Sequence, residues 1–333
     1  MPQITTATQQ VQIGKETTPG TAVACPTLLK CFDWTPGIDA GISKYRPSGN
    51  MYDATQELDW ESSLFNLNGT LDYNGIIYPL AMIYGQVTPA AHGASSTAKD
   101  WIWTPSINQQ TSLQTFTLMQ GDNQRARKLA YAMLSSFGYK GDRKTAFSLT
   151  GSGFGQIISD GITLTSSPTA LATAQMQPKT FNVYLDTSSG GIGGTQVIAP
   201  ISIDYSFGSV FGQAYYLNRS NPSFTSAINT QPATEIKLLL PADSFGLSTM
   251  QGYMESQQTL YLRIDAQGAT IDVPNSVVNE FQHDAAVKVG KPSALQDKGG
   301  IYAIEWPLNI VQDPSWNSGQ AQKITVTNLI TAL

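Results

Sequence analysis

Side chains that could carry acid–base or nucleophilic chemistry are sparse in this sequence. Its two histidines are His92 and His283. A Ser-His-Asp triad needs a base that a rigid scaffold holds against its nucleophile. His92 lies instead in the Ala/Gly-rich stretch 89–94, and the side chains of His283 and Asp284 point apart in an extended segment. We therefore expect His283 to be exposed and neither histidine to be catalytic.

Four closely spaced carboxylates form the next candidate. Glycosidases use pairs of acids, and calcium sites use several carboxylates in one loop. The spacing here matches no calcium-binding loop, and the stretch 49–59 has the composition of a hairpin tip. A solvated acidic loop is the favoured interpretation. The four residues are Asp53, Glu57, Asp59 and Glu61.

The cysteines and glycines also lack the spacing of known sites. Cys25 and Cys31 flank Pro26, and no further Cys or nearby His completes a zinc set, so we expect two small buried side chains. Glu16 follows Gly14-Lys15 where a phosphate-binding loop needs Ser or Thr. The sequence therefore predicts a protein that is not an enzyme, with no catalytic residue, cofactor or metal.

Composition favours an assembling β-protein. Charged residues are 13% of the chain, against roughly 25% in ordinary soluble domains, while 29 Gly and 18 Pro indicate many turns. The formal net charge of −5 and the scattered 19 Lys and Arg leave no basic footprint for tight nucleic-acid binding. The sequence has no apolar run of the roughly 18 residues that a membrane helix needs. Its N-terminus does not resemble a signal peptide, so no membrane anchor is expected.

The elements that would position any site are mostly strands. Apolar and polar residues alternate in segments 145–150, 200–205, 259–265, 301–310 and 323–327, which predicts half-buried antiparallel strands. Two segments have apolar residues at helical spacing. In 72–85, Asp72 or Asn74 is the expected cap and Pro79 predicts a kink or a late start. In 243–257, Asp243 is the expected N-cap.

These elements recur along the chain. The strands 63–71 and 234–240 each precede a helix, and Leu67 and Leu238 are 171 positions apart. Trp34 and Tyr205 have the same offset, and 11–20 aligns with 181–190. The predicted fold is therefore mainly β, with two tandem β-sandwich or barrel domains, each with one flanking α-helix. We place the domains at 1–165 and 179–333, a linker at 166–178, and long irregular loops at 88–114 and 266–300.

The ten residues from Ile13, Ile-Gly-Lys-Glu-Thr-Thr-Pro-Gly-Thr-Ala, resemble the start of the major tail tube proteins of long-tailed bacteriophages. The resemblance is specific over residues 11–24, moderate to position 155 and weak beyond it. It implies domains whose inner strands join around a ring, with rings stacked into a hollow tube for DNA ejection. It also implies a place in the virion tail, assembly in the bacterial cytoplasm, and contacts with tape-measure, tail-terminator and distal tail proteins.

Six domains per ring, as the family implies, would require three chains of two domains, so a trimer is favoured over a hexamer. DNA would pass without specific binding. The resemblance implies contacts between rings through the segment 11–24 and the hairpin-like segment 44–60. Their candidate contact residues are Val11, Ile13, Lys15, Glu16, Pro19, Lys44, Arg46, Tyr52 and Asp53. Asp265 and Glu305 are the candidate lumen residues. Deleting residues 1–24 is expected to leave a folded protein that forms no tubes.

Two alternatives remain open at the level of sequence. The first is a phage decoration protein or carbohydrate-binding β-sandwich whose tryptophans face sugars, namely Trp101, Trp103, Trp306 and Trp316. The second is a β-sandwich glycosidase that uses the acids between Asp53 and Glu61.

Overall fold

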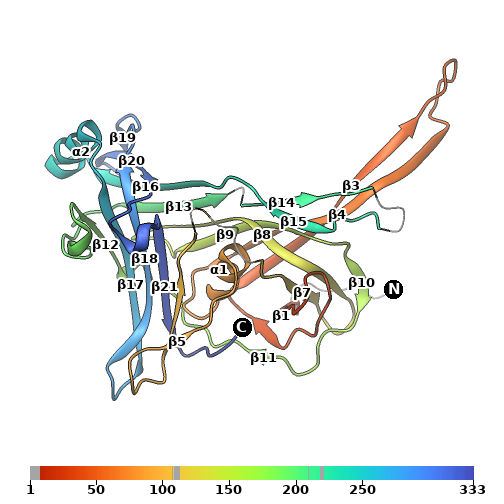
Figure 1. The fold of residues 1–333 in the computed structure, drawn as a ribbon, viewed down its shortest axis with the longest axis horizontal. Coiled ribbons are helices and arrows are strands. Elements are labelled where there is room, and N and C mark those ends of the chain that lie inside the picture. Colours follow the sequence, from red (N-terminus) through yellow and green to blue (C-terminus); the bar gives the residue numbers. More distant parts are fainter. Residues whose placement is uncertain (1–7, 107, 109–112, 209, 218–220) are drawn as a thin grey trace.

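The computed structural model describes residues 8–106, 108, 113–208, 210–217 and 221–333. The fold is mainly β, as the alternating segments predict, with two short α-helices between strands. Most strands belong to one extended hydrogen-bonded network that bends around the core, and a two-stranded arm projects from one end (Figure 1).

The first half of the chain begins and ends with short strands and has its longest strands in the middle. Its elements are β1 (Gln10–Lys15), β2 (Thr27–Leu29), β3 (Phe32–Tyr45), β4 (Thr55–Thr70), α1 (Ile77–Tyr84), β5 (Ala90–Ala91), β6 (Lys99–Trp103), β7 (Phe116–Gly121), β8 (Ala126–Asp142), β9 (Ser148–Gly155), β10 (Ser159–Ile162) and β11 (Thr169–Ala170).

The second half has a similar succession. Its elements are β12 (Phe181–Asp186), β13 (Ser202–Gly208), β14 (Phe211–Ala214), β15 (Ser226–Asn229), β16 (Ala233–Pro241), a π-helical turn (Ser244–Thr249), α2 (Met250–Ser256), β17 (Leu260–Asp272), β18 (Val277–Val289), β19 (Gln296–Asp297), β20 (Tyr302–Ile310) and β21 (Gln322–Asn328). Single-turn 3₁₀ helices lie at Pro178–Thr180, Ser189–Gly191 and Asn317–Gly319.

The two halves repeat one order of strand pairing. β1 pairs with β7 and β7 with β8, just as β12 pairs with β17 and β17 with β18. Pairing then continues from β8 to β9, β4 and β3, and from β18 to β20, β16 and β13. β10 and β21 lie beside β8 and β18 in the same way. All these pairs are antiparallel, and the sequence echoes fall on strands that hold equivalent places.

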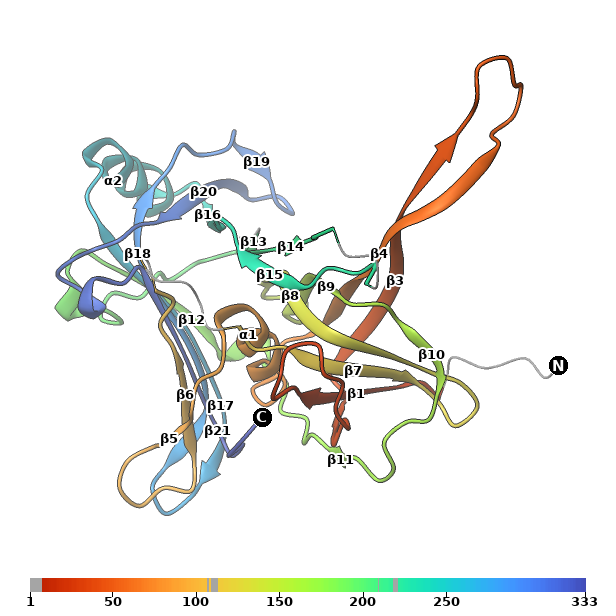
Figure 2. The same ribbon diagram turned by 45° about the vertical axis from the view of Figure 1, so that its right-hand side comes forward.

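One strand pair joins the two halves into a continuous sheet. β8 pairs with β13, with Phe137 opposite Phe207 and Asp142 opposite Ser202. The layer β3–β4–β9–β8–β13–β16–β20 therefore runs through the whole molecule (Figure 2). Because β8 also pairs with β7 through its first residues, this strand belongs to both layers around the first core.

The predicted domain boundary is crossed by a strand from the first half. β6 pairs with β21, with Trp103 opposite Ile324, although it precedes β21 by more than half the chain. Ser96 and Thr97 also donate hydrogen bonds to the Asp272 carboxylate, at 2.7 and 2.9 Å. The predicted linker 166–178 is a docked segment, since β11 pairs with β2 and Met176 is fully buried.

The prediction of an irregular loop over 266–300 is wrong. β17 runs to Asp272 and β18 spans Val277–Val289, so much of this stretch is a long hairpin. Polar residues at inward positions of β18, Asn279 and His283, conceal its alternation in the sequence. Within the predicted loop 88–114, the structure describes β5 and β6, and residues 107 and 109–112 lie outside its described part.

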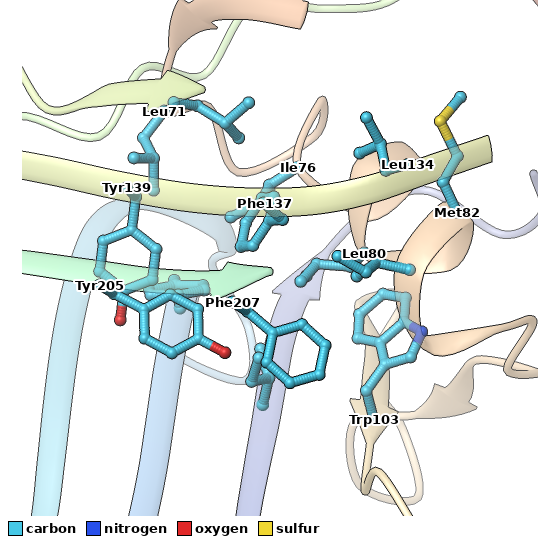
Figure 3. Close-up of a cluster of buried hydrophobic side chains, with 14 of the residues drawn as sticks. Leu71, Ile76, Leu80, Met82, Trp103, Leu134, Phe137, Tyr139, Tyr205 and Phe207 are labelled. Carbon is cyan, nitrogen blue, oxygen red and sulfur yellow. The ribbon is translucent and has the colours of Figure 1, made fainter. Parts of the chain in front are cut away.

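The helices differ in how far they are buried. α1 has seven buried residues in succession, Ile77 to Ile83, so it is enclosed by the core and does not flank it. Figure 3 shows its Leu80 near Trp103 and Phe207, and its Met82 near Leu134. α2 has only Met250 buried and flanks the second half. The Asp72 carboxylate accepts from Asn74 N and Gly75 N, and α1 begins only at Ile77, which agrees with the predicted late start.

Candidate functional site

The N-terminal sequence motif forms a buried anchor within the chain. The Glu16 carboxylate is 3% exposed and accepts hydrogen bonds from Gly20 N, Thr115 Oγ1, Thr117 Oγ1 and Tyr131 N, at 2.7–3.0 Å. These contacts join the turn after β1 to β7 and β8. A buried carboxylate is stable only when it is hydrogen-bonded in this way. The motif therefore has an internal structural role.

The glycines of the motif fit the same close packing. A Cβ on Gly14 would lie 2.1 Å from the Ala24 carbonyl oxygen, and Gly20 has a φ of +79°, which favours glycine. Among the candidate contact residues, Val11 and Ile13 are buried in the core, Lys15 is half-buried and Pro19 is exposed. The side chains of Val11, Ile13 and Glu16 are thus occupied inside the chain.

The β3–β4 hairpin carries the other candidate contact residues outward. Its strands extend away from the body as an arm (Figures 1 and 2). Lys44, Arg46 and Asp53 are exposed at or near its tip, and Tyr52 is 80% exposed beside Met51 at 81%. The prediction of a solvated acidic loop is correct only for Asp53, since Glu57 and Asp59 are exposed on strand β4 and Glu61 is half-buried further along it. The arm therefore offers apolar and charged groups that its own chain does not cover.

A polar face covers the central part of the continuous sheet, opposite the core face. Cross-strand neighbours on it are small: Asn68 lies opposite Thr150, Thr150 opposite Gly138, and Gly138 opposite Ser206. The alternating residues Leu67, Leu149, Phe137 and Tyr205 point into the core. We call this surface the polar sheet face. It is made by Asn66, Asn68, Ser136, Gly138, Lys140, Ser148, Thr150, Ser152, Asp204, Ser206, Glu235 and Lys237, and part of it forms an open hollow of 580 Å³.

The charges on the polar sheet face are paired within it. Lys140 Nζ lies 2.7 Å from Asp204 Oδ2, and Lys237 Nζ lies 3.1 Å from Glu235 Oε2. The hydrogen bond to Glu235 raises the pKa of Lys237. Glu305, a candidate lumen residue, is half-buried on the neighbouring strand β20, opposite Leu239. The sequence offered no signal for Lys140, Asp204 or Lys237, because only the sheet brings them together.

The second lumen candidate lies elsewhere. Asp265 is on β17, which pairs with β12 and β18 in the layer across the core from β16 and β20, and it is 5% exposed. Burial and the nearby Glu280 raise its pKa to about 6, and its Oδ1 has no hydrogen-bond partner among the described residues. Arg263 instead pairs with Asp284 at 2.7 Å.

The strands at the two ends of the continuous layer each pair with a single neighbouring strand. β3 pairs with β4 alone among the described strands, and β19 pairs with β20 alone. These edges are equivalent to the two strands that meet at the internal junction. β3 holds the place of β13, while the end of β18 together with β19 runs along β20 as β8 runs along β9.

A buried polar chain crosses the interface of the two halves. The Tyr84 and Tyr205 hydroxyls are 2.7 Å apart, Tyr205 donates to Gln322 Oε1 at 3.3 Å, and Gln322 Oε1 is 3.1 Å from His283 Nε2. Because that oxygen can only accept, Nε2 carries the proton and Nδ1 accepts from the Tyr139 hydroxyl at 2.8 Å. Figure 3 shows Tyr139 and Tyr205 beside one another. The expectation of an exposed His283 is wrong, since it is 1% exposed.

The structure also shows the surroundings of the two cysteines and of His92. Cys25 is buried and Cys31 half-buried, both are free thiols, and burial raises the pKa of each to about 12. His92 Nδ1 lies 2.9 Å from Asp100. No group of three or more potential metal ligands occurs in the described part of the chain. Among the same residues, no helix is both long and apolar enough to cross a membrane.

The tryptophans proposed to face sugars are mostly internal. Trp101, Trp103 and Trp306 are each 1% exposed, and Trp306 Nε1 donates to the Gly246 carbonyl at 2.7 Å. Trp316 is half-buried against Tyr261. Three of the four aromatic rings are therefore unable to contact a carbohydrate, which weakens the carbohydrate-binding alternative.

Comparison of the chain with known protein families finds no match, and comparison with curated proteins finds no relative.

Proposed function

We propose that this protein is the tail tube protein of a long-tailed bacteriophage, which assembles into stacked rings around a channel for DNA. The observation that carries the proposal is the β8–β13 junction. It joins the β8 place of the first half to the β13 place of the second half, and the counterparts of these two places, the β18 end with β19 and β3, have no such partner at the two ends of the layer. Since unpaired edges promote association with further strands, the same contact between neighbouring chains would pair both ends of the layer and close it into a ring.

The ring has three chains in this proposal. Each chain supplies two repeats of one pairing order, and the family resemblance implies six such units per ring. β3 of one chain pairs with the β18 end and β19 of the next. The layer that contains the polar sheet face becomes the channel wall, and the β3–β4 arm contacts the adjacent ring through residues near Tyr52. By the same resemblance, tape-measure, tail-terminator and distal tail proteins bind at the channel and the tube ends.

The edge contact is testable with introduced cysteines. Thr35→Cys on β3 is combined with a cysteine at Leu295, Gln296 or Asp297 in turn, because these positions are the two residues of β19 and the one before it. Purified protein is oxidised and run on a denaturing gel without reductant. We expect covalent species that end at three chains for at least one pair, and no intermolecular product from either single variant. Lys140→Cys with Asp204→Cys, directly opposed at the internal junction, is the positive control.

Negative-stain images of the same preparations test the function itself. Hollow tubes with a ring repeat are the expected result. Covalent species that end at six chains would overturn the chain count. Discrete particles without tubes, together with no intermolecular disulfide at any tested pair, would overturn the proposed function.

A further inference from the structure

A row of charges crosses four neighbouring strands, β8, β13, β16 and β20. Lys140 on β8 lies opposite Asp204 on β13, and Asp204 lies opposite Lys237 on β16. Glu235, two residues before Lys237 on β16, forms an ion pair with it. The negative charges of Glu305 and Asp204 also act on Lys237 and raise its pKa. We call these five residues the charge row.

Stability does not account for the charge row. The Lys140 side chain is 66% exposed and that of Asp204 35%, and the Lys237–Glu235 pair is similarly open. Exposed ion pairs contribute about 0–1 kcal/mol each, because water screens them and ordering long side chains costs entropy. Their main physical effect is therefore on the electrostatic potential of the sheet face.

The surroundings make the two lysines the groups most able to hold a phosphate. Their neighbours on the polar sheet face are Ser, Thr, Asn and Gly, whose side chains are short and uncharged. A lysine ammonium binds a phosphate as a point charge, and each such contact releases counterions and adds to non-specific DNA affinity. A carboxylate within 3.1 Å competes for the same ammonium.

We propose that Asp204 and Glu235 neutralise Lys140 and Lys237, so that the polar sheet face lets a DNA duplex slide past without holding its phosphates. This inference rests on the proposed function for its choice of DNA as the passing polymer. In this inference, two acids account for the weak binding of DNA to the polar sheet face. If the overall acidic charge were the cause, all acidic residues of the chain would contribute. Asp204 and Glu235 are positioning residues that act through the lysines.

The test uses the full chain before assembly, in which the polar sheet face is open to solvent. Binding of a short fluorescent DNA duplex is followed by anisotropy between 0.05 and about 0.2 M salt, the range in which phosphate contacts lose affinity steeply. The wild-type chain is expected to show no saturable binding. D204N/E235Q is expected to bind with a log–log salt slope of about −2, since each lysine–phosphate contact contributes about −0.9.

Two further variants separate this effect from general charge. Adding K140Q/K237Q to the acid variant is expected to abolish the binding. E57Q/E255Q changes the net charge equally at exposed acids that form no ion pair among the described residues, and it is expected to behave as wild type. Circular dichroism melts check that each variant is folded.

The inference is overturned if D204N/E235Q binds no more DNA than wild type, or if K140Q/K237Q leaves its binding unchanged. Either result leaves the proposed function standing wherever tubes form. Conversely, if no tubes form but the variants bind DNA as expected, the proposed function is rejected. The conclusion that Asp204 and Glu235 neutralise the two lysines then still stands.

Discussion

At the scale of single residues, Glu16 shows how a family-like motif can serve the fold itself. Its carboxylate collects donors from a turn, from β7 and from Tyr131 of β8, where the backbone has a φ of +57°. Such a conformation costs energy in a bulky residue and persists only where surrounding contacts hold it. The Glu16 contacts with the backbone provide that support.

Glu16→Gln tests this role. The amide replaces one acceptor oxygen of the carboxylate by an NH₂ donor. At least one buried hydrogen bond to the charged carboxylate is therefore lost, and the NH₂ group faces another donor. We expect the free energy of unfolding to fall by about 2–4 kcal/mol, measured by urea denaturation. Lys15→Gln, at the half-buried neighbouring position, is the control and should change it by less than about 0.5 kcal/mol. Equal effects of the two changes would contradict the anchor role.

His283 and Asp265 are predicted to give opposite pH dependences. Burial lowers the pKa of His283 from 6.5 to about 4, so its contribution is complete above pH 6.5 and is lost as the pH falls towards 4. Burial raises the pKa of Asp265 from 3.8 to about 6, so its contribution is complete below pH 3.8 and is lost as the pH rises through 6. Each of these two pKa shifts changes the free energy of unfolding by about 3 kcal/mol at most.

Single substitutions should separate the two contributions. His283→Gln is expected to flatten the loss of stability between pH 6.5 and 4, whereas Asp265→Asn is expected to raise stability at pH 7 by about 1–3 kcal/mol. Urea midpoints measured at pH values from 4 to 8 check both. An unchanged pH profile for His283→Gln, or a less stable Asp265→Asn at pH 7, would show these assignments to be wrong.

At the scale of elements, β1 and the β3–β4 arm differ in how well they fit the ring-contact role that the sequence indicates for both. β1 pairs with both β2 and β7 and contributes Val11 and Ile13 to the core. Deleting residues 1–24 should therefore unfold the first half, and not only prevent tube formation. The arm, by contrast, has exposed Ile38, Ile42, Met51 and Tyr52 that the chain itself leaves uncovered.

Shortening the arm is the cleaner test of stacking. Replacing residues 43–58 by a two-residue Asn-Gly turn removes exposed side chains and the half-buried Pro47. We expect an unfolding free energy within about 1 kcal/mol of wild type, retention of covalent trimers in the cysteine assay, and loss of long tubes in negative-stain images. Full-length tubes from the shortened protein would exclude the arm from the contact between rings.

At the scale of the whole molecule, the fold is two similar pairing patterns joined by more than a linker. The β8–β13 junction, the β6–β21 strand pair and the buried Tyr84–His283 chain all connect the halves. Phe224, which precedes β15, adds a further contact by packing on Tyr131 and Phe154 of the first half. These contacts make independent motion of two domains physically costly, so each chain would enter a ring as one unit.

The sequence by itself determined the mainly β class, the positions of several strands and the capping role of Asp243 at the turn before α2, because period-two alternation and local hydrogen bonding are properties of neighbouring residues. The sequence also indicated that β1 and β12 occupy corresponding positions in the two halves of the chain. Only the tertiary structure decided that Glu16 and His283 are internal, that β6 crosses to the second half, and that Lys140, Asp204 and Lys237 form one row. Those features depend on contacts between residues far apart in the chain, to which no local pattern corresponds.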